Sequence, residues 1–459
     1  MPLILPANTL SAAGYDVANS CRFEDGDSPS LSKTPGSAGD RTEWTFSAWI
    51  KLGSATGTQV LFNGYDSGDN ETRIFISSRK LSYYNYVSSS ADGEYISSRV
   101  LRDHSGWYHI VVAIDNDEGT AGDRIRFYIN GVEETHFGTE TAPSSGSTTF
   151  INNDDVHYIG QSGSDAQYFD GYMAEVCFID GTQYAASDFG EFDSDSPSIW
   201  KPKDVSGLTF GSNGAYLDFE DSGNLGDDES GNGNDWAENN IVAADQATDT
   251  PTNNFCTGNP IIHGGKLPAL SQGNCLFISD GDWMHVPSTI GVANGKWYAE
   301  FKCVAKTGGQ MMGVVDAGSI AGWGASPPLY VGNDALGHCY QDNGNKQTGD
   351  TATSYGATYT DGDIIGAALN ADDGEITFYK NNAVQDSGTA ITLPTSTSSD
   401  GIWFWLPSVE TGTIAANWGG CSAFAISSAA NDENGYGVFE YAPPSDYLAM
   451  CTKNLATNG

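Results

Sequence analysis

Short runs of alternating or continuously apolar residues recur along the chain between turn signals, and helical periodicity is almost absent. In residues 124–129, apolar residues occupy every second position (Ile125, Phe127 and Ile129), so their side chains lie on one face of a strand. Asn130-Gly131 follows them, a pair that tolerates positive φ and favours a tight hairpin. Residues 110–114 are apolar at every position, which is typical of a strand buried on both faces. The pattern therefore predicts strands, not helices, over the first half of the chain.

The second half of the chain repeats this style. Residues 296–303 alternate between an apolar and a more polar face, and residues 364–369 form a candidate inner strand. Residues 375–380 alternate again and lead into Asn381-Asn382, a turn pair. We therefore predict an all-β fold with two antiparallel β-sandwich (jelly-roll-like) domains in tandem.

The middle of the chain differs from both halves. From about residue 194 to 259 it is rich in Asp, Asn, Gly and Ser, with prolines as breakers. Its aromatic residues are too many for a solvated tether; they are Trp200, Phe210, Tyr216, Phe219, Trp236 and Phe255. We expect residues 1–195 to form the first sandwich, residues 196–260 a connection packed on it, and residues 261–459 the second sandwich with a C-terminal extension.

The charge and composition of the chain exclude several classes of binding partner. The chain has 459 residues, with 20 Lys and Arg against 59 Asp and Glu, so its formal net charge is −39. Such a chain lacks the clustered cations that track phosphates, which argues against nucleic acid as a partner and against anionic membrane surfaces. No apolar run approaches the ~20 residues of a spanning helix, so we expect no membrane insertion. The eight cysteines lie far apart without a C-x-x-C pair, so their spacing supports neither a disulfide framework nor a zinc site.

Five motifs in order give the first half its family resemblance. They are Ser20–Phe23 with Ser30–Ser32, Trp44–Ile50 (WTFSAWI), Trp107–Val112 (WYHIVV), Phe127–Gly131 (FYING), and Tyr158–Gly160 with Phe169–Val176 (FDGYMAEV). In this order they resemble the strands of the laminin-G-like, concanavalin A-like lectin family. The resemblance covers about 160 residues and implies a lectin-type β-sandwich in which Glu175 is a structural position.

Three motifs in the second half resemble the SPRY family, which also has a β-sandwich fold. They are Gly295–Phe301 (GKWYAEF), Asp361–Leu369 (DGDIIGAAL) and Ile376–Asn381 (ITFYKN). Asn382 stands where that family usually has Gly, and Asn is the residue that next best tolerates positive φ.

A third resemblance concerns the whole arrangement. The amino-acid sequence of residues 172–202, 249–255 and 441–444 resembles that of proteins encoded by tailed phages of marine bacteria. It implies a non-enzymatic virion protein, a tail fibre, adhesin or capsid decoration, that binds host-surface glycan or neighbouring virion subunits through its sandwich loops. It further implies a homo-oligomer that is made in the host cytoplasm and exposed on the extracellular particle. The alternatives are a glycan-degrading enzyme on the lectin-like fold and a purely structural virion subunit.

The enzymatic alternative finds little support in the motifs. A retaining glycosidase needs two carboxylates about 5 Å apart, and sandwich glucanases carry them on an E-x-D-x-(x)-E strand. The nearest approach is Glu191-Phe192-Asp193, which lacks the final Glu and is followed by breakers. The histidines are dispersed, His109 is expected to be structural, and no H-E-x-x-H, G-x-S-x-G or P-loop motif is present. We predict no catalytic residue, although a triad assembled from distant residues stays open.

Calcium is the one cofactor that the resemblance makes a candidate, because laminin-G-like domains often hold one Ca²⁺ through loop oxygens. Acidic, turn-rich loops suit this ion, which takes six to eight oxygen ligands. The candidate ligands fall in two loops: Asp66 and Asp69 in the first, and Asp227, Asp228, Asn232 and Asp235 in the second. The alternative is that these side chains cap their own turns.

Candidate ligand contacts are aromatic, because sugars stack on aromatic rings and loops of a sandwich carry its variable chemistry. The candidates are Tyr84, Tyr86, Trp323, Tyr330, Tyr355 and Tyr359. For Tyr84 and Tyr86, which alternate, packing on a sheet face is the alternative. Trp323 lies between two glycines, and its ligand could be either a protein partner or a glycan.

Overall fold

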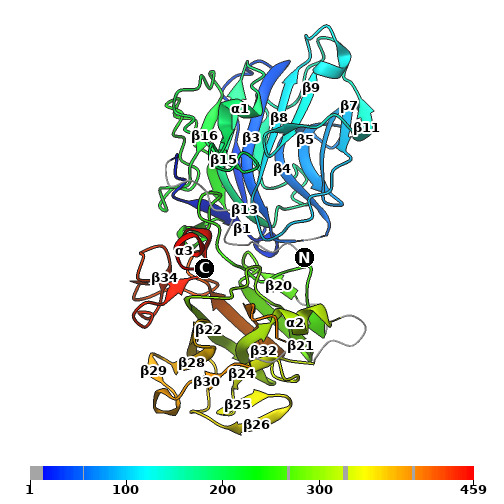
Figure 1. The fold of residues 1–459 in the computed structure, drawn as a ribbon. Helices are drawn as coiled ribbons and strands as arrows, with labels where there is room; N and C mark the ends of the chain where they lie inside the picture. The colour runs from blue at the N-terminus through cyan, green and yellow to red at the C-terminus, as the bar shows by residue number, and fades with distance from the viewer. Residues whose placement is uncertain (1–13, 55, 266–268, 324–328, 395–398) are drawn as a thin grey trace. The chain divides into compact units, whose positions relative to one another are not determined.

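The computed structural model describes residues 14–54, 56–265, 269–323, 329–394 and 399–459 (Figure 1). The chain divides into two compact units with the division between Thr252 and Asn253. We call them the N-terminal unit and the C-terminal unit, and each is described by itself.

Two antiparallel sheets of eight strands each make up most of the described part of the N-terminal unit. Sheet A contains, in spatial order, β10 (Val132–Glu133), β9 (Ile125–Ile129), β8 (Tyr108–Asp115), β3 (Glu43–Leu52), β13 (Gly171–Asp180), β1 (Ser20–Phe23) and β18 (Gln246–Ala247), with β16 (Ala215–Leu217) beside β13. Sheet B contains β11 (Phe137–Thr141), β7 (Ser90–Ser97), β6 (Lys80–Val87), β5 (Asn70–Ser77), β4 (Thr58–Ser67), β12 (Val156–Ile159), β2 (Ser30–Lys33) and β17 (Ala237–Asn239).

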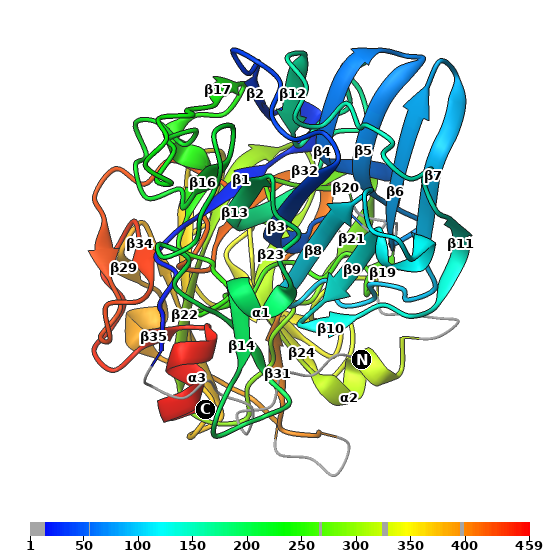
Figure 2. The same ribbon diagram turned by 90° about the horizontal axis from the view of Figure 1, so that it is seen from above.

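The two sheets form the layers of a sandwich (Figure 2). Alternation along each strand sends one set of apolar side chains between them. Phe46 of β3 stacks on Phe62 of β4 with ring centroids 5.0 Å apart, and both are fully buried. Ile110 and Val112 of β8 lie in the same core cluster. The apolar run of residues 110–114 is thus a central strand, paired with β3 on one side and β9 on the other.

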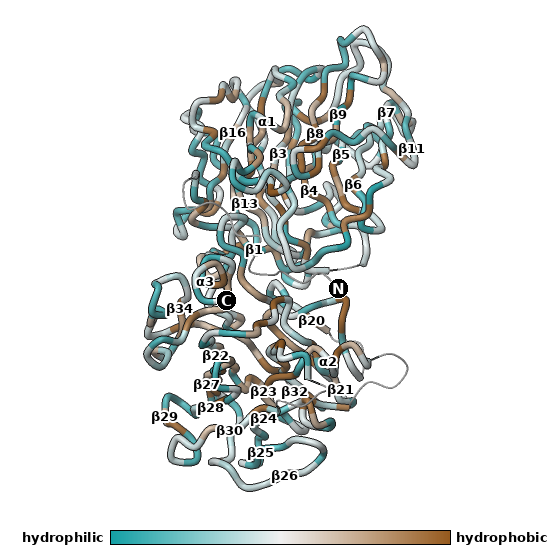
Figure 3. The backbone as a smooth tube through the Cα atoms, viewed as in Figure 1, coloured by the Kyte–Doolittle hydropathy of each residue, from teal (hydrophilic) through white to brown (hydrophobic). Residues whose placement is uncertain are grey.

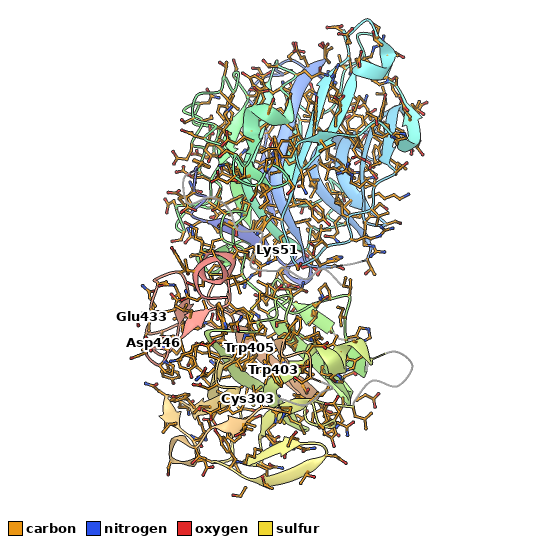
Figure 4. The ribbon with its side chains drawn as sticks, viewed as in Figure 1. Lys51, Cys303, Trp403, Trp405, Glu433 and Asp446 are labelled. Atoms are coloured by element: carbon orange, nitrogen blue, oxygen red, sulfur yellow. The ribbon has the colours of Figure 1, made fainter. Side chains whose placement is uncertain are left out.

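The outer face of sheet A is also buried, because later parts of the chain fold over it. This cover includes α1 (Ala186–Phe189), β14 (Gly190–Phe192) and β15 (Trp200–Pro202). Phe189 packs with Val111 and Cys177 of the sheet in a second cluster. Polar outward residues of β3 are enclosed as a result, and Lys51, labelled in Figure 4, is only 1% exposed.

Residues 196–252 are part of the N-terminal unit, since they supply β16 and β18 to sheet A and β17 to sheet B. The division at residue 252 differs from the expected one at residue 260. Its physical reason is that Phe255 bridges to Cys451 and Cys256 donates its backbone N–H to the carbonyl of Met450, both in the C-terminal unit.

One large sheet, antiparallel except for the β22–β35 pair, forms most of the described part of the C-terminal unit. Its main path runs β26 (Thr351–Ser354), β25 (Asn345–Thr348), β24 (Gly337–Gln341), β23 (Gln310–Asp316), β32 (Ser408–Asn417), β22 (Lys296–Lys306), β27 (Ile364–Asn370), β28 (Glu375–Lys380) and β29 (Ala383–Val384). The side strands are β19 (Gly264–Gly265), β20 (Ala269–Ser271), β21 (Leu276–His285), β30 (Ile391–Thr392), β31 (Trp403–Trp405) and β35 (Leu448–Ala449). Outside this sheet lie the pair β33 (Ala430–Asn431) and β34 (Val438–Phe439) and the helices α2 (Ala317–Ala321) and α3 (Thr452–Asn458).

The C-terminal core follows the predicted alternation, with brown segments concentrated along the strands in Figure 3. Phe301 packs edge-on against Trp405 and Trp418, and all three are fully buried. Figure 4 labels Trp405 together with Cys303 of β22. All eight cysteines of the chain are buried.

The prediction of an all-β chain with two antiparallel sandwiches in tandem is confirmed. In the described residues, every helix is too short or too polar to cross a membrane.

Breaking the buried ion pair between sheet A and its cover should strongly destabilise the N-terminal unit. Lys51 Nζ lies 2.6 Å from Asp249 Oδ2, and both side chains are almost fully enclosed. Asp249→Asn leaves the ammonium without its counter-charge, so we expect a loss of about 3–5 kcal/mol in the free energy of unfolding. Urea denaturation followed by tryptophan fluorescence measures this loss.

The matched control is Asp123→Asn, which removes the partner of Arg126 at an exposed site. This change should cost no more than about 1 kcal/mol. Equal effects of the two substitutions would contradict the importance that we assign to the buried pair.

Candidate functional site

The outer face of sheet B carries an aromatic and charged patch on β5 and β6. We call it the Tyr84 face and define it as Glu71, Arg73, Phe75, Tyr84 and Tyr86. In the β5–β6 hairpin Arg73 pairs with Tyr84 and Glu71 pairs with Tyr86, so these side chains point the same way. The intervening residues of both strands point into the core, as the burial pattern shows.

A hydrogen-bonded network fixes the side chains of the Tyr84 face. The Tyr84 hydroxyl donates to Glu71 Oε1 over 2.5 Å, and Arg73 Nη2 lies 3.1 Å from the same oxygen. The guanidinium lies 4.4 Å from the centre of the Tyr84 ring, and Tyr86 stands edge-on to that ring at 4.6 Å. Arg73 Nη1 also donates to Gln167 Oε1, on the loop before β13. These contacts hold the rings in one arrangement before any ligand arrives.

In the Tyr84 face, Glu71 and Arg73 each oppose the pKa shift that burial causes in the other. Burial raises the pKa of Glu71, and the Arg73 cation opposes that shift. Burial likewise lowers the pKa of Arg73, and Glu71 opposes that shift. Arg73 Nε has no hydrogen-bond partner among the described residues. That Nε–H is itself buried, so the face offers a ligand mainly the half-buried Tyr84 and Tyr86 rings beside the Arg73–Glu71 pair, an aromatic and polar surface that suits a polyhydroxylated ligand.

Sequence reasoning identified Tyr84 and Tyr86 but missed Glu71, Arg73 and Gln167. The alternation of residues along the strand from 71 to 75 could have identified Glu71 and Arg73, because residues 71, 73 and 75 lie on one face. Nothing in the sequence places Gln167 beside them, because its approach depends on how a distant loop folds.

Two of the four aromatic candidates in the C-terminal unit are half-buried. Trp323 donates from Nε1 to Ser319 Oγ and stands edge-on to His285 at 4.7 Å. The Tyr330 hydroxyl donates to Asp350 Oδ1 over 2.7 Å, and its ring packs against Trp283 at 4.9 Å. Both line the rim of one apolar cluster, and residues 324–328 between them lie outside the described residues.

Tyr355 and Tyr359 are core residues, which corrects their candidacy as ligand contacts. They are 5% and 1% exposed. The Tyr359 hydroxyl donates to the backbone carbonyls of Gln310 and Tyr340. The segment after β26 turns inward, so rings expected on a loop pack against Tyr340.

The first loop predicted to bind calcium uses its carboxylates within its own turns. Asp66 Oδ2 accepts a hydrogen bond from Asn70 Nδ2 at 3.0 Å, and Asp69 Oδ1 accepts one from the Ser89 hydroxyl. The first bond lies within the β4–β5 hairpin, and the second ties that hairpin to the β6–β7 hairpin. Among the described residues the two aspartates belong to no group of converging metal ligands.

The second predicted loop is centred on Asp228, which is buried and saturated with donors. Its Oδ1 accepts from the N–H groups of Tyr216 and Ser230, and its Oδ2 accepts from Ser230 Oγ and the N–H of Asn234. The other predicted ligands also make bonds of the turn: Asp227 with Asn224, Asp235 with the Asp228 N–H, and Asn232 with the carbonyls of Gly211 and Gly214. In both loops the predicted ligands therefore make hydrogen bonds within the protein, as the alternative interpretation of the sequence expects.

A carboxylate group that sequence reasoning missed forms elsewhere in the N-terminal unit. Oxygens of Glu24, Asp25 and Asp170 all lie within 4.8 Å of one another. The three come from opposite ends of the first domain's sequence, so neither spacing nor composition points to them.

The candidate acid pair of the enzymatic alternative is held by a lysine. Lys201 Nζ lies 3.4 Å from Glu191 Oε1 and 3.3 Å from Asp193 Oδ2. Asp193 is buried, and its Oδ1 accepts from the N–H groups of Asp195 and Ser196. One lysine is thus shared by both carboxylates, and Asp193 is committed to a turn.

A serine–histidine contact lies under the cover of sheet A, with the wrong tautomer for nucleophilic catalysis. Trp200 Nε1 donates to His109 Nδ1 at 3.0 Å, so Nδ1 is the acceptor of the ring. Burial lowers the pKa of His109 to about 3, which keeps the ring neutral and leaves its proton on Nε2. Nε2 lies 2.9 Å from Ser47 Oγ and donates to it, whereas a general base must accept there.

The N-terminal unit is therefore a two-sheet antiparallel sandwich with one covered face and one open face. Comparison with protein families agrees with both halves of the fold. Residues 25–186 match the model described as concanavalin A-like lectin/glucanases superfamily, and residues 296–399 match that of the SPRY domain. The chain carries a concanavalin A-like domain followed by a SPRY domain, which confirms both resemblances.

Individual relatives are distant. One 150-residue stretch is 29% identical to the ATP-dependent RNA helicase DDX1 of Xenopus laevis and covers 30% of this chain but 18% of that helicase. The human HERC1 SPRY domain has 15% identity and a TM-score of 0.28, over 37% of this chain and 99% of its own. A candidate carbohydrate-binding protein of Bacteroides ovatus has 14% identity and a TM-score of 0.34, over 50% of this chain and 60% of its own.

Replacing Asp228 should destabilise the N-terminal unit without changing its response to calcium. Asp228→Asn substitutes an amide donor for one acceptor oxygen, so we expect a loss of about 1–3 kcal/mol from unpaired buried groups. Urea unfolding in calcium and in EGTA should give the same loss. A loss seen only in calcium would show that the loop binds the ion.

Proposed function

We propose that this chain is a non-enzymatic glycan-binding protein, and that the Tyr84 face is its sugar contact. A lectin-type fold suggests glycan binding. The observation that carries the proposal is the network in which Arg73, Glu71 and Tyr84 hold one another on an open sheet face. A saccharide ring can lie against Tyr86 and Phe75 while its hydroxyls exchange hydrogen bonds with the guanidinium and the carboxylate.

The net negative charge of the chain favours neutral ligands over anionic ones. With 59 acidic and 20 basic residues, the protein repels polyanions at low salt, and salt screens this repulsion over about 10 Å at 0.1 M. The Arg73–Glu71 pair is neutral as a unit, which suits a neutral or weakly charged saccharide. The setting that we propose is the surface of a phage particle, on the resemblance of residues 172–202, 249–255 and 441–444. There, many copies would compensate for a weak single site.

Removing the Tyr86 ring should weaken glycan binding without unfolding the protein. Tyr86 is half-buried, and its hydroxyl takes no part in the network described above. We expect Tyr86→Ala to reduce affinity roughly tenfold, the loss of one stacking contact of about 1 kcal/mol or more. Glycan arrays first identify a bound saccharide, and titration calorimetry then compares the variant with wild type.

The control is Tyr436→Ala, which removes an exposed tyrosine from the C-terminal unit. Its affinity should equal that of wild type. Unchanged affinity in Tyr86→Ala, or binding lost equally in both variants, would move the sugar contact away from the Tyr84 face. Silence on arrays of bacterial and algal glycans would instead favour a structural virion subunit.

Incubation with polysaccharides should release no reducing sugar, because Glu191 and Asp193 both form ion pairs with Lys201 and Asp193 is buried in a turn. Wild type and Glu191→Gln should therefore give the same baseline in a reducing-sugar assay. Reproducible turnover that disappears in Glu191→Gln would establish the enzymatic alternative.

A further inference from the structure

Lys51 and Asp249 meet on the covered face of sheet A, although they stand 198 residues apart in the sequence. Lys51 belongs to strand β3 in the middle of the sheet, and Asp249 follows the edge strand β18. Lys51 Nζ lies 2.6 Å from Asp249 Oδ2, and the two side chains are 2% and 0% exposed. The fold therefore holds an amine against a carboxyl group and shields both from solvent.

The surroundings of this pair are aromatic. Tyr172 lies opposite Lys51 in the pairing of β3 with β13, and the centre of its ring is 5.9 Å from Lys51 Nζ. Trp107 packs against Tyr172, with ring centroids 6.3 Å apart. Because burial removes hydration from both ions, it narrows the free-energy gap between the ion pair and its neutral form, an amine beside a carboxylic acid.

Trp107 also contacts the carboxyl group directly. Its indole Nε1 donates to Asp249 Oδ1 at 3.1 Å, whereas the lysine faces Oδ2. A donor on Oδ1 stabilises the negative charge that develops there when a nucleophile adds to the carboxyl carbon. With an ordinary hydrogen-bond angle at Oδ2, Nζ lies roughly 3.5 Å from that carbon, which is a near-attack separation. Nucleophile, carboxyl carbon and oxyanion donor are thus in place together.

We propose that Lys51 and Asp249 join in an intramolecular isopeptide bond, which the folded chain forms without another reactant. The ion pair is the state before reaction. The Lys51 ammonium gives one proton to Asp249 Oδ2, and the lone pair of the neutral amine then adds to the carboxyl carbon. The C–Oδ2 bond breaks, and Oδ2 takes a second proton from Nζ and leaves as water. One amide and one water are the products, so atoms and charge balance and no oxidant or reductant is needed.

The bond constrains the N-terminal unit. It closes a loop between residues 51 and 249, which restricts the unfolded chain and so favours the folded one. It also fastens the last residues of the unit, which ends at Thr252, to the middle of sheet A. A pull on the chain at that point is then carried by a covalent bond and not by the edge strand β18 alone.

Lys201 provides a control within the same molecule, because it also faces carboxylates. Its Nζ lies 3.3 Å from Asp193 Oδ2 and 3.4 Å from Glu191 Oε1, and the Glu191 side chain is 55% exposed. These separations are longer, and the solvated Glu191 stabilises the ammonium as an ion. We therefore expect an amide at Lys51 and none at Lys201.

Mass spectrometry of the denatured full chain tests the proposal. Most wild-type molecules should have the mass of the sequence less one water. A tryptic digest should contain a branched peptide that joins Lys51 to Asp249, and Lys201 should occur only in unbranched peptides. If wild type has the full mass of its sequence, the two groups stay an ion pair and the proposal is wrong.

Lys51→Arg separates the covalent bond from the ion pair. Arginine keeps a positive charge beside Asp249, but its guanidinium stays protonated and is not a nucleophile. This variant and Asp249→Ala should both have the full mass of their sequences. A loss of water that persists in either variant comes from another dehydration, such as succinimide formation at an Asp-Gly pair, and would contradict the proposal. If a variant does not fold, the branched peptide of wild type decides the question by itself.

Trp107→Phe tests the chemistry of bond formation. The change keeps an aromatic ring but removes the donor to Asp249 Oδ1, so the bond should form roughly a hundredfold more slowly. The fraction of linked chain is followed by mass after cell-free synthesis of the full chain. A rate equal to that of wild type would contradict the mechanism. All of these readouts are independent of glycan, so they leave the proposal for the Tyr84 face unaffected.

Discussion

Burial of the outer face of sheet A under later chain is the constraint on which the N-terminal unit depends. A two-sheet sandwich normally leaves both outer faces to water, and its outward residues are then polar. Here β3 keeps polar outward residues such as Thr45, Ser47 and Lys51, yet all three are almost fully buried. Each has a buried partner: the carbonyl of Thr182 for Thr45, His109 of the neighbouring strand β8 for Ser47, and Asp249 for Lys51.

This constraint separates the two sheets in function. On sheet A the cover turns groups that resemble catalytic parts into structural ones. Glu175, whose pKa burial raises to about 7, accepts from the Tyr216 hydroxyl. Within the part of the chain that the structure describes, no such cover lies over β5 and β6 of sheet B, and Arg73, Tyr84 and Tyr86 stay half-buried. A face that is rigid, aromatic and accessible is where recognition can occur without cost to the core.

Strand positions were predictable wherever burial enforces a strict pattern. Residues 110–114 and 364–369 read as inner strands because both of their faces are apolar, and they are β8 and part of β27. The same reasoning failed at Tyr355 and Tyr359. Their Gly- and Thr-rich surroundings are typical of a loop, and only the tertiary fold shows that the loop turns both rings into the core.

The candidate site was predictable only in part for a related reason. Alternation within one strand identified Tyr84 and Tyr86, since both lie on one face whatever the partner strand is. Arg73 joins them through the register of a hairpin, and Gln167 through a loop that approaches from another part of the chain. Asp170 meets Glu24 only because β13 pairs with β1, a long-range pairing that local pattern does not determine.

Much of the acidity of this protein is structural. Asp316 accepts four hydrogen bonds, from the backbone of Gly318, Asp400 and Gly401 and from the Ser399 hydroxyl. Asp432 likewise accepts from three backbone N–H groups and from Asn454.

A carboxylate with two oxygens and several acceptor positions can gather irregular backbone that no strand satisfies. A chain with many long turns needs such anchors, so its negative charge does not require a cationic ligand. Asp170 is different because no N–H group reaches its carboxylate among the described residues. That difference, and not the abundance of acid, is what sets Asp170 apart from the aspartates that anchor turns.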